Sequence, residues 1–230
     1  MIMQEKLKWN AIGLVRKTQS LRDYIQREKD AIPVDHTSKH TKRENYLAEL
    51  NHLLERMEKI EKILIPKLEG IFRLKFTTPE LIMFALSNTS IRNIFEDLNT
   101  LFINDPNRPL KKEELIELAS SGDAAKVLAL IGDAALDLAI VQLLWDSSLS
   151  TTGKLTEKRK EVASNLNLAK YCDEWGLFGC QLNRFRAIEH EDTKPETIIH
   201  DKGTLVESIL GVIYLEFGLE VLLRIVPLIQ

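Results

Sequence analysis

The sequence predicts an all-α protein. Apolar residues recur at spacings of three and four along almost the whole chain, which is the period of amphipathic helices. Segments that alternate apolar and polar residues and are enriched in β-branched residues, as strands are, are few. With 230 residues, of which 44% are hydrophobic, the chain is long enough to bury one core, or one core and a small appendage.

Two amphipathic segments in the first third of the chain predict a helical hairpin. Their apolar stripes include Leu14 in the first segment and Leu47 in the second, and Pro33 with the polar residues after it separates them. Pro66 is expected to end or kink the second helix near Leu64. We therefore predict an N-terminal helical hairpin over residues 1–70 and a second helical domain over residues 71–230.

Start and stop signals place the elements of the second domain. Thr78 precedes Pro79 and Glu80 in the order expected of a helix start, with the cap before a proline in the first turn. Gly122 and Asp123 are expected to open the longest helix. Loops rich in proline or in small polar residues are expected over residues 104–109, 146–153 and 189–202.

Composition favours a protein of the cytoplasm. The N-terminal residues lack the uninterrupted apolar stretch of a secretory signal, and the two cysteines are too few for a disulfide framework. Charged residues interrupt the apolar segment Leu205–Gln230 too often for a bilayer core, so we expect no membrane association. The formal net charge of -3 gives no global attraction to nucleic acid, so any such binding needs a local basic patch.

Two motifs point to a known family. The helix at residues 128–136, Leu-Ala-Leu-Ile-Gly-Asp-Ala-Ala-Leu, resembles the ribonuclease III signature Leu-Glu-Phe-Leu-Gly-Asp-Ala-Val-Leu. Residues 205–218 are similar to a second family motif, and two softer matches at residues 76–90 and 162–170 stand in the correct order. The resemblance covers residues 76–230 and implies a stand-alone ribonuclease III domain, without the separate double-stranded-RNA-binding domain of many members.

The resemblance implies a magnesium site, and the site is incomplete here. In the family, two carboxylates four residues apart on the signature helix face two others three residues apart on a later helix, and together they hold the ions that hydrolyse RNA. The corresponding residues are Ala129 and Asp133, and then Thr204 and Glu207. A further family glutamate, two turns before Asp133, is replaced by Lys126. We expect Asp133 and Glu207 to be the catalytic and metal-binding residues, with magnesium weak or absent.

Lys126 is expected to substitute for the metal. It lies almost two helical turns before Asp133 on the same face, so its ammonium could lean toward Asp133 or Glu207 and compete with magnesium. We therefore hypothesise a salt-bridged relic or a weak single-metal site. Asp137, one turn after Asp133, is the alternative replacement ligand and the less favoured one.

An RNA surface and a dimer contact are also expected. Lys154, Lys158, Arg159 and Lys160 form the densest basic cluster of the nuclease-like part, which suits the phosphate backbone of A-form RNA, although a solvated helix face is the plainer interpretation. Leu130 matches the family position where a large apolar residue plugs a socket on a partner subunit, which implies a homodimer. The alternative is that Leu130 faces its own core.

Three functional hypotheses follow. The leading one is a ribonuclease III-like protein that engages double-stranded or structured RNA with catalysis reduced or lost. The second is an active magnesium-dependent endoribonuclease on double-stranded RNA, with Asp133 and Glu207 holding one ion. The third is a ribosome-associated structural protein that uses the fold without its chemistry, and a helical scaffold with no RNA role is the remaining alternative.

Overall fold

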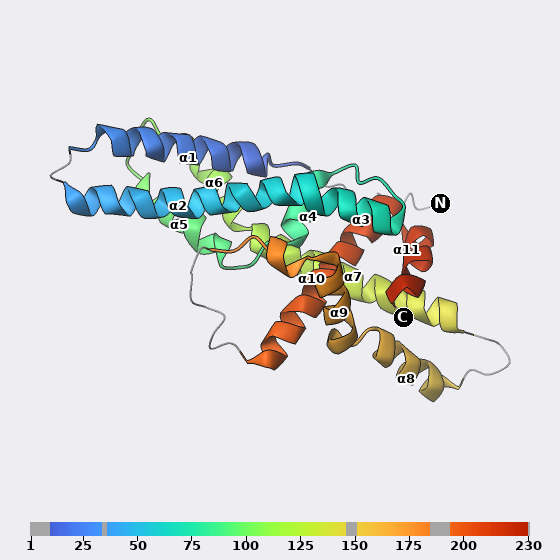
Figure 1. The fold of residues 1–230 in the computed structure, drawn as a ribbon. Helices are drawn as coiled ribbons and strands as arrows, with labels where there is room; N and C mark the ends of the chain where they lie inside the picture. The colour runs from blue at the N-terminus through green and yellow to red at the C-terminus, as the bar shows by residue number, and fades with distance from the viewer. Residues whose placement is uncertain (1–9, 34–35, 146–150, 185–193, 230) are drawn as a thin grey trace.

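The predicted all-α class is confirmed. The computed structural model describes residues 10–33, 36–145, 151–184 and 194–229, and within these ranges the only β-structure is an isolated bridge between Ser87 and Leu182 (Figure 1). The α-helices are α1 (Leu14–Ala31), α2 (Thr37–Lys59), α3 (Ile65–Phe72), α4 (Pro79–Ala85), α5 (Ile91–Leu101), α6 (Lys112–Ala119), α7 (Ser121–Leu144), α8 (Thr152–Val162), α9 (Asn165–Trp175), α10 (Pro195–Phe217) and α11 (Leu219–Ile225).

Helices α1 and α2 form the predicted hairpin, and the chain stays helical beyond α2 and past Pro66. A π-helical segment, Ile60–Leu64, joins α2 to α3, and Pro66 lies in the first turn of α3. Proline has no N–H and its ring clashes with the carbonyl four residues earlier, so the change of hydrogen-bond register just before it relieves the conflict. Residue 70, the predicted domain boundary, lies within α3, and one cluster of buried apolar side chains includes residues on both sides of it.

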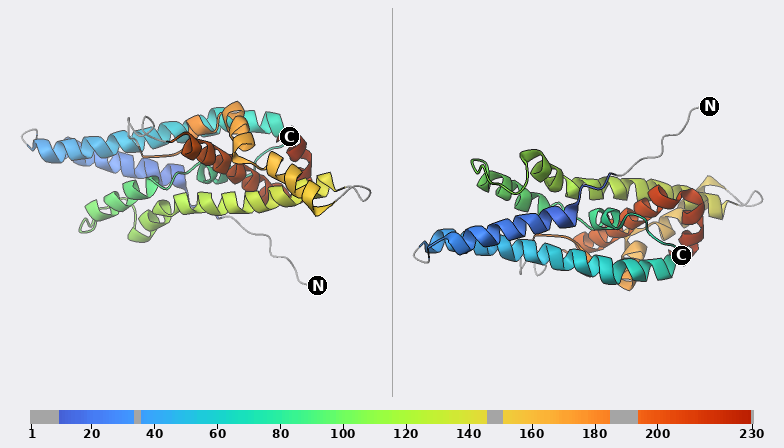
Figure 2. Two further views of the ribbon diagram at one scale, coloured as in Figure 1. Left: turned by 90° about the horizontal axis from the view of Figure 1, so that it is seen from below. Right: turned by 90° about the horizontal axis from the view of Figure 1, so that it is seen from above.

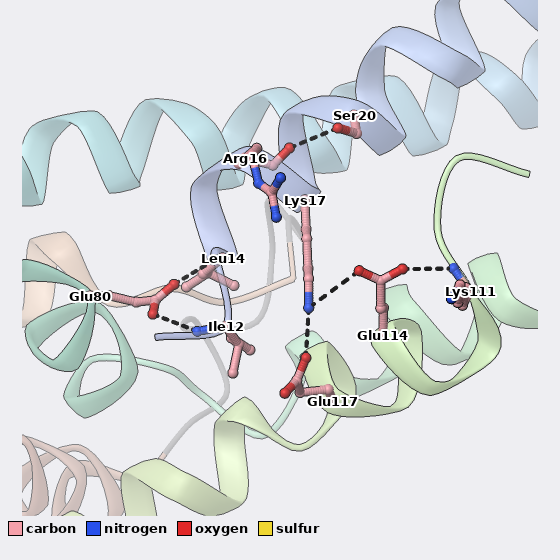
Figure 3. A network of polar contacts seen from close by, with 9 residues as sticks. All are labelled: Ile12, Leu14, Arg16, Lys17, Ser20, Glu80, Lys111, Glu114 and Glu117. Atoms are coloured by element: carbon pink, nitrogen blue, oxygen red, sulfur yellow. Dashed lines mark hydrogen bonds and ion pairs between the residues drawn. The ribbon is translucent and has the colours of Figure 1, made fainter. Parts of the chain in front are cut away.

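Polar contacts attach the hairpin to the rest of the molecule (Figure 3). The Glu80 carboxylate, on α4, accepts hydrogen bonds from the backbone N–H groups of Ile12 (2.9 Å) and Leu14 (2.5 Å), at the N-terminus of α1. These N–H groups have no partner within the helix, and the Glu80 carboxylate supplies one. Lys17, which is buried, pairs with Glu117 (2.6 Å) and Glu114 (3.7 Å) on α6. The hairpin is therefore docked on α4 and α6 through its first helix.

Helices α7 and α10 cross with their backbones in contact. A Cβ built on Gly132 would lie 1.8 Å from the backbone oxygen of Glu207, and one on Gly211 would lie 2.1 Å from that of Leu128. Only glycine permits an approach this close. This crossing holds Asp133, next to Gly132 on α7, close to Glu207 on α10.

The expectation of a loop over residues 189–202 is wrong from Pro195 onward. Helix α10 begins at Pro195, so the last eight residues of the expected loop, 195–202, are helical. A proline in the first turn followed by Glu196 is itself a helix-start signal. The polar composition of the segment, which is typical of loops, led to the wrong expectation. Residues 189–193 of that expected loop lie outside the described ranges, as do residues 1–9 and 146–150.

One helical stretch, Lys112–Leu144, is long and apolar enough to cross a membrane by length and composition alone. Its most apolar window has a mean hydropathy of 2.0, and 39% of that window is buried inside the molecule. The stretch contains both α6 and α7, which are separate helices of the fold. The core helix of a soluble protein meets the same criteria of length and composition.

Candidate functional site

The structure brings Asp133 and Glu207 together, and Asp137 joins them. Asp133 is exposed on α7, whereas Glu207 is half-buried on α10. Burial, followed by the negative charges of Asp133 and Asp137, raises the pKa of Glu207 to about 7. The α7–α10 crossing therefore gathers three carboxyl groups.

Arg159 is the cation that reaches this group. Its guanidinium donates to the Asp137 carboxylate at 2.7 Å and ties α8 to α7. Burial raises the pKa of the Asp137 carboxyl group, Arg159 lowers it, and the charge of Asp133 raises it. One of the four residues that the sequence assigns to RNA binding is thus engaged in an internal ion pair.

The side chain of Lys126 does not pair with Asp133 or Glu207. It is exposed, and among the described residues it forms no ion pair or hydrogen bond with Asp133 or Glu207. Seven residues correspond to a rise of about 10 Å along a helix axis, so sharing a face with Asp133 does not bring the two side chains into contact. Lys126 instead lines a cavity of 340 Å³ together with Thr204, the second residue that stands where the family has an acid.

The residues present do not build the four-carboxylate magnesium site. Over the part of the chain that the structure describes, no group of three or more His, Cys, Asp or Glu side chains is placed to hold a metal ion. Ala129 is buried and Thr204 has only a hydroxyl, so each pair lacks one carboxylate. Asp133 and Glu207 remain, and they lie close enough for the charge of Asp133 to raise the pKa of Glu207.

Comparison with known proteins identifies one domain within the chain. Residues 126–218 match the family model of the ribonuclease III domain. The chain contains a ribonuclease III domain. The match begins at Lys126 and includes the α7–α10 crossing with Asp133 and Glu207. In the same comparisons no curated protein and no solved structure matches the chain. A ribonuclease III domain indicates a function related to double-stranded RNA, in a family whose endonucleases generally use magnesium.

Three exposed lysines of the ribonuclease III domain lie on α8. Lys154, Lys158 and Lys160 are exposed, and none of them forms an ion pair with another described residue. Only Val162 of this helix is buried. Figure 1 shows α8 at the end of the molecule far from the α1–α2 turn.

Helix α7 of the ribonuclease III domain presents an apolar face to solvent. Leu130 is 69% exposed and so does not face the chain's own core, which was the alternative left open by its spacing. Val127, Leu138 and Trp145 are exposed beside it at helical spacings. In both views of Figure 2, α7 runs along one long edge of the molecule and the α1–α2 hairpin lies toward the opposite edge.

Sequence reasoning missed the residues around Lys126. His200 and Asp201, from the first turns of α10, and Asn88, from the loop after α4, line the cavity that contains Lys126 and Thr204. The helix-start signal at Pro195 was the available indication that His200, Asp201 and Thr204 share a helix face, because residues three and four apart lie side by side. No local signal places Asn88 beside them.

Proposed function

We propose that this protein binds double-stranded or structured RNA through its ribonuclease III domain, with catalysis reduced or lost. The observation that carries the proposal is the carboxylate set. Asp133 and Glu207 converge at the α7–α10 crossing, but Ala129 and Thr204 occupy the other two family positions. The remaining nearby acid, Asp137, is paired with Arg159. Two carboxylates provide too little negative charge to replace the water around two magnesium ions.

The exposed lysines of α8 supply the phosphate contacts in this proposal. Duplex RNA is recognised mainly through its backbone and shape, and each lysine that neutralises a phosphate releases counterions, so binding weakens as salt rises. Lys154, Lys158 and Lys160 are free for this role, whereas Arg159 joins it only by leaving Asp137. The chain's net charge of -3 confines the attraction to this surface.

The purified protein is expected to bind a generic duplex RNA and not to cleave it. Cleavage is measured with magnesium and then manganese, alongside Asp133→Asn, which distinguishes this site from a contaminating nuclease. Reversing Lys158 and Lys160 to glutamate should weaken binding about tenfold to a hundredfold at low salt, since two phosphate contacts are lost and two repulsions added. The matched control reverses Lys39 and Lys42, two exposed lysines of α2, with no comparable loss. Cleavage that disappears in Asp133→Asn would instead establish a working nuclease.

We also propose that the apolar face of α7 joins two copies of this chain. Leu130→Glu should convert a dimer to a monomer, because a carboxylate buried in an apolar interface without a partner costs several kcal/mol. Light scattering coupled to gel filtration measures the mass, and circular dichroism verifies that the fold is unchanged. Leu166→Glu is the matched control, since Leu166 on α9 is similarly exposed, at 63%. A monomeric wild-type protein at micromolar concentration, or a Leu130→Glu dimer, would contradict the proposal.

A further inference from the structure

The cavity beside the carboxylates is lined by two of the three residues that stand where the family has an acid. Lys126 from α7 and Thr204 from α10 line it, and its volume is 340 Å³. Cavities of this size accept small ligands. Exchange of two acids for an ammonium and a hydroxyl changes the preference of this space from a cation to an anion.

The wall opposite the two helices is firmly built. The backbone N–H of Asn88 donates to the oxygen of Leu182 at 2.7 Å, and the N–H of Leu182 donates to the oxygen of Leu86 at 2.8 Å. Gly122 allows the loop to press against α7, because a Cβ there would lie 2.7 Å from the Cα of Thr89. The cavity therefore exists before any ligand arrives, which lowers the entropy cost of binding.

Hydrogen-bond donors without partners gather in this cavity. The ammonium of Lys126 has no acceptor among the described residues, and the side-chain oxygen of Asn88 is already used by the N–H of Ser90 at 2.9 Å, which leaves the Asn88 amide N–H groups as donors. The Asn165 amide lies 3.2 Å from Nδ1 of His200; with that nitrogen as acceptor, the His200 proton is on Nε2. The hydroxyl of Thr204 completes the set.

Asp201 is the one carboxylate of the lining, and it forms no ion pair with the described cations. Asp201 accepts hydrogen bonds and donates none when ionised. The cavity thus combines one cation and several donors with one anionic acceptor. A bare phosphate would use the first group and be repelled by Asp201, whereas a ligand with both a phosphate and hydroxyl groups would use all of them.

We propose that this cavity binds one unpaired ribonucleotide of RNA. Its phosphate lies against Lys126, Asn88 and Thr204, and its 2′-hydroxyl donates to Asp201. The inference rests on the proposed RNA-binding function and adds a subsite for a nucleotide that leaves the duplex. Because the 2′-hydroxyl is absent from DNA, the subsite also distinguishes RNA from DNA.

The test uses adenosine 5′-monophosphate and its 2′-deoxy analogue as probes, with binding followed by NMR on the isotope-labelled full chain. We expect shifts at Asn88, His200 and Thr204, and an affinity about tenfold higher for the ribonucleotide, which is the effect of one hydrogen bond to a charged group. Lys126→Gln should weaken binding of both probes about tenfold or more, since it removes the charge. Asp201→Asn should remove most of the preference for the ribonucleotide.

Lys126 is exposed, so its substitution leaves the fold intact, and Lys39→Gln is the matched control with unchanged affinity. Equal binding of the two probes, shifts outside the cavity, or a Lys126→Gln protein that binds like wild type would overturn the proposal. Duplex binding, measured in parallel with the α8 variants, tests the proposed function separately. If the wild-type protein binds duplex RNA but shows no nucleotide effect, only this subsite is overturned; if the wild-type protein does not bind duplex RNA, the proposed function is overturned.

Discussion

Gly132→Ala is expected to destabilise the protein by about 4 kcal/mol or more, among the largest effects of any single substitution. The added Cβ would lie 1.8 Å from the backbone oxygen of Glu207, and no side-chain rotation relieves a clash between a β-carbon and a helix backbone. Helices α7 and α10 must separate, and no other pair of the described helices is in more extensive contact. Gly211→Ala, 2.1 Å from the oxygen of Leu128, should behave alike. Urea unfolding followed by circular dichroism measures the change.

Gly70→Ala is the control for this prediction. Gly70 lies inside α3, and a Cβ there would have no other atom within 4 Å. Alanine in a helix interior should therefore raise the free energy of unfolding by about 0.5 to 1 kcal/mol through lower backbone entropy in the unfolded chain. A loss at Gly132→Ala of less than about 1 kcal/mol would mean that the two helices do not cross in contact.

The helices themselves are predictable from local signals. The apolar spacing of α1 and α2, and Thr78 before Pro79 at the start of α4, are properties of short segments, so the sequence displays them directly. The proximity of Asp133 and Glu207 is not a local property, because the two residues lie 74 positions apart in the sequence (207 − 133). Only the resemblance to the ribonuclease III family predicted it.

Contacts between helices account for what the sequence did not predict. The pairing of Arg159 with Asp137 depends on how α8 docks on α7, and the cavity at Lys126 depends on the loop at Asn88. Periodicity places Lys126 and Asp133 on one face but ignores the rise of the helix between them. It also cannot distinguish a face that packs inside the chain from one that is exposed, which left the environment of Leu130 open until the structure placed it in solvent.

The stability of the protein should fall as the pH rises from about 4.5 to about 7 because of Glu207. The pKa of its carboxyl group is raised from 4.5 to about 7 in the folded state, so across this window the folded chain holds a proton that the unfolded chain has released. Folding binds more protons there, and each step up in pH lowers the free energy of unfolding. Above the folded-state pKa the cost is constant, at roughly 2 to 3 kcal/mol once solvent screening of this half-buried group is included.

Glu207→Gln should remove this dependence, because glutamine keeps the shape of the protonated carboxyl group and does not ionise. We expect the variant to match wild type at pH 4 and to exceed its unfolding free energy by roughly 2 to 3 kcal/mol at pH 8, in denaturant titrations at both values. Glu161→Gln, at an exposed position of α8, is the control and should change stability little at either pH. If Glu207→Gln gains nothing at pH 8, Glu207 is solvated and the three carboxyl groups do not converge. A higher unfolding free energy of Glu207→Gln at pH 8 would show that the ionised Glu207 destabilises the fold. Such a cost is expected of a carboxylate that serves binding rather than stability.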